Sequence, residues 1–101
     1  MMMQLPAADY GEVIRLAPGD PRGWRNRGLI RPFKEDLAHG IADYDQAIKL
    51  DPTDAYSHNN RGQAKLRKGD RDGVIAVFKK ALELRPDLRQ VQEIVRRLGA
   101  R

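Results

Sequence analysis

The chain has 101 residues, 41% of them apolar and 33% charged, with no cysteine and a formal net charge of +5. This length predicts one domain and excludes doubly wound nucleotide-binding folds and barrel enzymes, while the missing cysteines exclude disulfide frameworks and thiolate zinc sites. No apolar stretch approaches the roughly 20 residues of a membrane span, and the chain as given has no signal-peptide pattern. We therefore expect a cytoplasmic protein with no membrane partner.

The charge is unevenly placed along the chain. Residues 1–50 carry seven Lys and Arg against seven Asp and Glu, whereas residues 51–101 carry twelve against seven. The whole excess of five lies in the second half, where it favours acidic partners through long-range attraction. The basic residues are 13 Arg and 6 Lys, a composition that favours a GC-rich bacterial source.

Two helices are predicted in the first third of the chain. Residues 5–17 form the first, which carries apolar side chains at helical spacing. The second covers residues 21–33, because the Asp20 carboxylate can cap it and Pro21 is harmless in its first turn. Pro32 lies near its end, where a proline clashes with the preceding turn, so we expect an early stop or a kink.

The middle of the chain predicts a second pair of helices. Residues 37–50 carry apolar side chains at steps of three and four residues, which is one face of a helix. Asp54 then caps a helix over residues 55–68. Gly69 ends that helix, since glycine readily adopts the left-handed backbone found at helix termini.

Two further helices complete the chain. Asp70 is the expected cap of a helix over residues 71–84, which Pro86 ends. Residues 87–98 form a last amphipathic helix with one wet face, which we expect to cap the fold. No segment alternates like a strand between turn signals, so the predicted fold class is all-α.

A period of 34 residues relates these helices to one another. Pro18, Pro52 and Pro86 are spaced by 34 residues, and the same shift superposes Asn26-Arg27-Gly28 on Asn60-Arg61-Gly62. Each period is a pair of helices, so 1–101 is predicted as a single domain built from repeats. Its expected parts are a partial repeat at 5–18, full 34-residue repeats at 19–52 and 53–86, and a capping helix at 87–101.

The repeat resembles the tetratricopeptide repeat (TPR) family. The first full period meets that family's pattern of aromatic, small and proline positions at Trp24, Gly28, Gly40, Tyr44 and Pro52. The second meets it at Gly62, Phe78 and Pro86, with Val74 at a small-residue position and His58 at the tryptophan position. The resemblance implies a right-handed α-solenoid of antiparallel helix pairs, in which glycines let the helices approach and the aromatics fill the core. Two full repeats are fewer than the roughly three that a solenoid usually needs.

The sequence contains no catalytic or metal-binding pattern. His39 and His58 are the only histidines, and there is no phosphate-cradling glycine loop, no His-Glu-x-x-His motif and no cysteine nucleophile. We expect a non-catalytic protein without a cofactor, in which His58 fills the tryptophan position and His39 lies in solvent.

The resemblance implies that the first helix of each pair lines a concave groove that binds a peptide or protein segment. By register, the expected groove residues are Arg22, Arg25, Asn26, Leu29, Tyr56, Asn59, Asn60, Gln63, Arg67 and Arg97. Phe33, Leu66, Gln90, Glu93 and Ile94 share that face. Amide side chains suit an extended backbone, and arginine can bind a carboxylate with two hydrogen bonds, so the expected partner is acidic. The alternative is that these are ordinary solvated polar residues.

Two other functions remain open. The first is self-association. The helix at residues 5–17 lacks the helix that precedes it in a full repeat, so it is expected either to fray or to form a homodimer through this edge. The alternative is that the chain is a fragment of a longer array. The second is RNA binding by a helical repeat, which the basic second half favours. Nucleic acid is the less expected partner, because most of the aromatic side chains are needed in the core.

Overall fold

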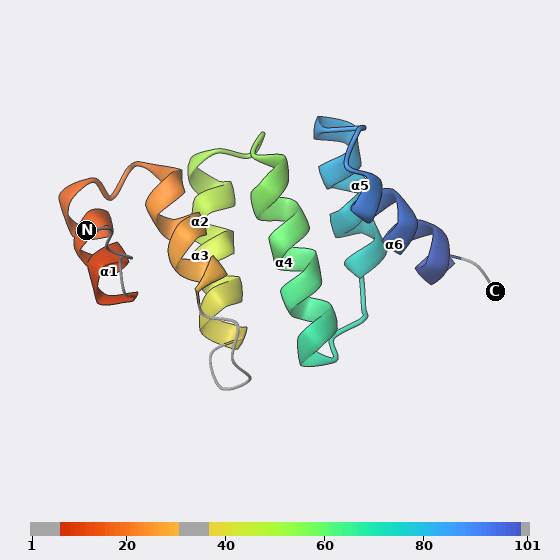
Figure 1. The fold of residues 1–101 in the computed structure, drawn as a ribbon, viewed down its shortest axis with the longest axis horizontal. Coiled ribbons are helices and arrows are strands. Elements are labelled where there is room, and N and C mark those ends of the chain that lie inside the picture. The colour runs from red at the N-terminus through yellow and green to blue at the C-terminus, as the bar shows by residue number, and fades with distance from the viewer. Residues whose placement is uncertain (1–6, 31–36, 100–101) are drawn as a thin grey trace, which may run out of the picture.

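The computed structural model describes residues 7–30 and 37–99, which form α-helices and no strand. The helices are α1 (Ala7–Leu16), α2 (Pro21–Leu29), α3 (Leu37–Leu50), α4 (Ala55–Lys68), α5 (Val74–Leu84) and α6 (Arg89–Gly99). They follow one another along the longest axis of the molecule, from α1 at one end to α6 at the other (Figure 1). The main packing contacts join each helix to the next in the chain. This nearest-neighbour packing is that of a helical-repeat solenoid, so the predicted all-α fold class is confirmed.

α2 and α4, the first helices of the two full repeats, each begin after an aspartate, and these two aspartates are 34 residues apart. The Asp20 side chain accepts a hydrogen bond of 3.0 Å from the backbone N–H of Arg22 at the start of α2. The Asp54 side chain accepts one of 3.1 Å from the backbone N–H of Tyr56 at the start of α4. Both predicted caps are confirmed, and each satisfies an amide that the helix itself leaves without a partner.

The turn between α4 and α5 differs in part from the prediction. Gly69 ends α4 in the left-handed conformation, with φ 91°, as predicted. The prediction that Asp70 caps the next helix is wrong, because α5 begins only at Val74 and its N-cap is Gly73. Gly73 has φ 71°, a conformation that no helix interior accepts, and the Asp70 carboxylate lies 3.6 Å from Lys65 Nζ on the preceding helix.

Two other helix boundaries also shift. The helix expected over residues 21–33 ends at Leu29, and Pro32, the expected cause of an early stop, lies outside the described residues. The last helix begins at Arg89, two residues after its expected start. The backbone first passes through a turn there, in which Leu88 N–H donates to Arg85 O at 3.3 Å.

The two central aromatic side chains each lie against a glycine of the preceding helix. Tyr44 is 4% exposed and Phe78 is fully buried. A Cβ atom built on Gly28 would lie 2.8 Å from Tyr44 Cε1, and one on Gly62 would lie 2.8 Å from Phe78 Cε1. Real Cβ atoms do not come so close, so the glycines are what allow the aromatic rings to fill the space between helices.

A side-chain hydrogen bond to a proline carbonyl recurs once in each period. Trp24 Nε1 donates to the carbonyl of the proline six residues earlier at 3.0 Å. His58 Nε2 lies 3.0 Å from the equivalent proline carbonyl, and Gln92 Nε2 donates to the third at 2.6 Å. The prediction that His58 takes the tryptophan position is confirmed. Gln92 further shows that α6 has the register of a first helix.

Candidate functional site

The expected groove residues lie on α2, α4 and α6, and all of them are at least partly exposed. Arg22, Arg25, Asn26 and Leu29 belong to α2; Tyr56, Asn59, Asn60, Gln63 and Arg67 belong to α4; Arg97 belongs to α6. Phe33 lies outside the described residues. Leu66 and Ile94 are partly buried and pack against the buried cluster around Phe78.

A hollow of about 150 Å³ lies between α2, α3 and α4. It is lined by Gly28, Leu29, Leu37, Gly40, Tyr44, Asn60, Gln63, Ala64 and Arg67. Leu29, Asn60, Gln63 and Arg67 are expected groove residues, and the structure brings these four together. The α3 residues that line the hollow were not expected, although a glycine at position 40, flanked by longer side chains, was a sequence signal for open space.

The floor of the hollow is apolar and the α4 wall is polar. Leu37 and Ala64 are 6% and 8% exposed and form one core cluster with Tyr44. On α4, Gln63 Nε2 donates to Asn59 Oδ1 at 3.0 Å, which orients the Gln63 amide. The hollow therefore offers buried apolar surface beside amide groups that can both donate and accept hydrogen bonds.

The phenol of Tyr44 stays neutral beside this hollow. Burial and, after it, the neighbouring Asp43 raise the pKa of Tyr44 to about 12, while Arg67 opposes the shift. Arg67 and Tyr44 both line the hollow. Among the described residues that line the hollow, Arg67 is the one with a charged side chain.

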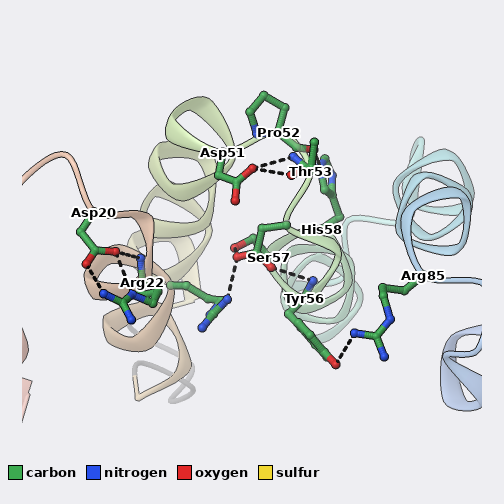
Figure 2. A network of polar contacts seen from close by, with 11 residues as sticks. Asp20, Arg22, Asp51, Pro52, Thr53, Tyr56, Ser57, His58 and Arg85 are labelled. Atoms are coloured by element: carbon green, nitrogen blue, oxygen red, sulfur yellow. Dashed lines mark hydrogen bonds and ion pairs between the residues drawn. The ribbon is translucent and has the colours of Figure 1, made fainter.

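Two expected groove arginines are paired with carboxylates of the chain itself. Arg25 Nη1 donates to Asp54 Oδ2 at 2.8 Å, and that carboxylate is only 8% exposed. Arg22 Nη2 donates to Asp20 Oδ2 at 2.7 Å (Figure 2). Hydrogen bonds from Arg22 lower the pKa of Asp20 to about 2. These pairs neutralise much of the positive charge that was expected to attract an acidic partner.

An exposed tyrosine of α4 is hydrogen-bonded to an arginine that lies at the end of α5. Arg85 Nη1 donates to Tyr56 Oη at 2.9 Å (Figure 2), and the guanidinium carbon lies 5.4 Å from the ring centroid. Arg85 also binds Asp87 at 3.1 Å and lowers the pKa of that carboxyl. Sequence reasoning missed Arg85, because its contact with Tyr56 spans 29 residues and leaves no local pattern.

A second hollow of about 330 Å³ lies between α1 and α2. Its lining residues are Tyr10, Val13, Asp20, Arg22, Gly23 and Asn26. Tyr10 and Asn26 precede Tyr44 and Asn60 by 34 residues, so both hollows contain a tyrosine and an asparagine at equivalent positions. The second hollow differs because it contains the Asp20 carboxylate.

Metal and membrane sites were also considered over the described part of the chain. Within residues 7–30 and 37–99, no group of three or more His, Cys, Asp or Glu side chains could hold a metal ion. None of the helices in these ranges combines the length and the apolar character needed to cross a lipid bilayer.

Comparison with known protein families gives two matches. A family model described as TPR repeat matches residues 35–69, and one described as tetratricopeptide repeat matches residues 55–88. Together the two matches cover α3, α4 and α5. No curated protein matches the chain.

Proposed function

Because the chain belongs to the tetratricopeptide-repeat family, whose repeats generally mediate protein–protein interaction, we propose that the face formed by α2 and α4 binds an extended peptide or protein segment. Proteins of this family are typically non-catalytic scaffolds. The observation that carries the proposal is the hollow between α2, α3 and α4, with Leu29, Asn60 and Gln63 among its lining residues. An apolar hollow beside a few polar groups is the usual form of a ligand site.

The proposed partner carries acidic groups. The net charge of +5 supports this, as does the presence of Arg67 in the lining of the hollow. Arg22 and Arg25 contribute less than the sequence suggests, because Asp20 and Asp54 already bind them. The attraction therefore comes from the basic second half of the chain.

Selection from a displayed library of random heptapeptides, followed by NMR titration of the ¹⁵N-labelled protein, tests this proposal. Selected peptides are expected to shift amide signals of α2 and α4. The double variant Asn60→Ala, Gln63→Ala is expected to weaken binding about tenfold, which corresponds to about 1.4 kcal/mol. The matched double variant Lys79→Arg, Lys80→Arg, which keeps the charge at two exposed positions of α5, leaves the affinity unchanged. Shifts confined to other helices, or an empty selection, contradict the proposal.

A second candidate is self-association through α1. Leu16 and Val13 are 70% and 38% exposed on this helix, and no helix packs on α1 from the side away from α2 among the described residues. Sedimentation of the wild type beside Leu16→Asp tests this candidate: a dimer that the variant dissociates supports it, and monomers in both samples contradict it. Ile14 is unsuitable for this test, because it is buried against Gly23.

RNA binding has less support than either candidate. Among the described aromatic side chains, Tyr56 is the exposed one, and the guanidinium of Arg85 already lies over its ring. Binding to generic single-stranded RNA that persists well above physiological salt contradicts the protein-partner proposal. Binding that is lost with a steep salt dependence is non-specific attraction to phosphate.

A further inference from the structure

α1 has the register of a second helix, and the first helix of its repeat is not among the described residues. We propose that α1 receives this helix from another protein, and that the incoming helix carries an arginine followed by a glycine. The proposal concerns the far side of α1, so it is independent of the peptide binding proposed for the face formed by α2 and α4. It is an alternative to self-association through α1.

One side of α1 is more exposed than the same side of the later second helices. Val13 is 38% exposed, whereas its counterparts Ala47 and Ala81 are fully buried. Leu16 is 70% exposed, and its counterpart Leu50 is 36% exposed. α1 and α3 are both followed by a first helix that packs on them, so the difference comes from the helix that precedes α3. The exposed side of α1 is therefore where a first helix would pack.

The aromatic position shows which residue of the incoming helix has to be small. Tyr10 is partly exposed, whereas Tyr44, its counterpart 34 residues later, is 4% exposed. A Cβ atom on Gly28 would lie 2.8 Å from the Tyr44 ring, so α2 approaches this ring because it has a glycine there. A helix that covers Tyr10 in the same way needs a glycine against the ring.

The sequence also places an acidic residue beside this aromatic position. Asp9-Tyr10 repeats Asp43-Tyr44 at a distance of 34 residues. Arg27, which precedes the glycine of α2, donates two hydrogen bonds of 2.9 and 3.0 Å to the carboxylate of Asp43. Charge-assisted pairs of this kind are strong and specific in geometry. By register, an arginine before the glycine of the incoming helix has Asp9 as its acceptor.

The second full repeat shows that this ion pair depends on the aspartate. α5 carries Val77 at the position of Asp43, and Arg61 of α4 instead donates to Asp45 on α3 at 2.7 Å. The Arg-Gly pair is common to α2 and α4, whereas the Asp-Tyr pair is common to α1 and α3. α1 therefore matches the second helix that binds its first helix through both contacts.

A second copy of the chain offers no matching helix within its described residues. Its α2 and α4 already pack on α3 and α5, and α6 contains no arginine followed by a glycine. The occupant that fits is a helix of a different protein. Its glycine lies on the Tyr10 ring, and its flanking apolar residues cover Val13 and Leu16, which removes their exposed surface from water.

NMR titration of the ¹⁵N-labelled chain with a peptide of its own residues 54–69 tests the proposal. This segment is α4 with its two caps and contains Arg61-Gly62. A hydrocarbon staple between positions 63 and 67 keeps it helical, since a short isolated helix is marginal in water. The peptide is expected to shift amide signals of α1.

Two changes in the peptide test its two contacts. Gly62→Leu is expected to weaken binding about tenfold, because the added side chain meets the Tyr10 ring. Arg61→Gln is expected to weaken binding several-fold, whereas the control Lys68→Gln, which removes an equal charge at the end of the helix, has little effect.

Changes in the chain test the same contacts from the other side. Leu16→Ser is expected to weaken binding several-fold, and the matched control Leu29→Ser on α2 leaves it unchanged; both leucines are exposed, so the variants retain the fold. Asp9→Arg is expected to weaken binding of the original peptide. A peptide with Arg61→Glu restores the affinity for this variant, because the two charges are exchanged.

The proposal is overturned if the peptide shifts no signal of α1, or if the original and Gly62→Leu peptides bind with equal affinity. It is also wrong if the chain alone sediments as a dimer that Leu16→Asp dissociates, because a second copy then occupies this side of α1. None of these results affects the proposed function, which depends on selected peptides that shift signals of α2 and α4.

Discussion

At the scale of single residues, a buried aromatic ring packs directly on a glycine in each full repeat. Gly62→Ala would place a Cβ atom 2.8 Å from the buried ring of Phe78, which has no room to move away. We expect this substitution to lower the free energy of unfolding by about 1–3 kcal/mol despite the better helix propensity of alanine. The urea midpoint of unfolding measures the change.

Gly11→Ala is the matched control for this substitution. Gly11 lies inside α1, and a Cβ there would meet its nearest neighbour, Arg27 Nη1, at an ordinary 3.8 Å. Alanine at this position is expected to raise the free energy of unfolding by about 0.5–1 kcal/mol. A Gly62→Ala variant more stable than the wild type would show that the Phe78 contact is looser than the structure has it.

His58 allows a second prediction, because the equivalent positions of the other two periods carry a tryptophan and a glutamine. His58→Leu removes the hydrogen bond to the Pro52 carbonyl and is expected to cost about 1 kcal/mol of stability, more if that carbonyl is left without a partner. His58→Gln and His58→Trp should retain most of the stability, since Gln92 and Trp24 make the same contact in their own periods. Thermal unfolding of the three variants checks this order.

A third prediction concerns pH. Asp20 has its pKa lowered from 3.8 to about 2 by Arg22, so its charged form contributes stability that is fully present above pH 4 and lost as the pH falls through 2. Asp20→Asn keeps a side chain that can cap α2 but removes the charge. The wild type should melt at a higher temperature than the variant at pH 7, and the difference should shrink towards pH 2. A difference that stays constant with pH contradicts the role of the ion pair.

Residue-scale features were predictable from the sequence only where they depend on local spacing. The caps at Asp20 and Asp54 follow from their places before a helix, and both are present. The pairing of Arg25 with Asp54 was not predictable, because it joins residues 29 positions apart on different helices. The groove is less positive than its arginines alone suggest, because ion pairs between distant residues cannot be seen in the sequence.

At the scale of the helices, one ion pair connects two first helices directly. Asp54 accepts from Arg25 on α2 and from Ser57 on its own helix, so it connects α2 to the start of α4. A double-mutant cycle with Arg25→Ala and Asp54→Ser, in which serine still caps the helix, is expected to give a coupling energy of about 1–2 kcal/mol. A coupling near zero would show that the two helices are held together by α3 alone.

The helices themselves were well predicted, and their errors have local causes. The predicted ranges 37–50 and 55–68 are those of α3 and α4. The start of α5 was set too early, because a glycine three positions after an aspartate does not reveal in sequence that it will adopt a positive φ. Gly73 takes that conformation, and the helix can begin only after it.

At the scale of the whole molecule, packing between neighbouring helices makes stability unequal along the chain. α3 and α4 each pack on a helix at either side, whereas α1 and α6 each pack closely on one, among the described residues. Hydrogen exchange should therefore be slowest in α3 and α4 and fastest in α1, where the exposed Leu16 adds little to the core. Uniform protection across α1 to α6 would contradict this gradient.

The period of 34 residues was enough to predict the architecture, because each repeat unit packs only against its neighbours. The resemblance to the TPR family had named four of the hollow's lining residues among the expected groove residues. It could not supply the contribution of α3 to the hollow, which depends on how Leu37 and Gly40 face the gap between two other helices. These α3 residues are part of the lining that bounds the hollow.

The register of α6, marked by the bond from Gln92 to its proline carbonyl, has a consequence for how the array can grow. Counting on by 34 residues from Gly28 and Gly62 leads to Arg96, an exposed side chain where the earlier first helices offer bare backbone. An aromatic residue of an added second helix would therefore collide with a long, charged side chain instead of packing on a glycine. A new unit can thus be engineered onto the α6 end only after Arg96 is replaced by glycine.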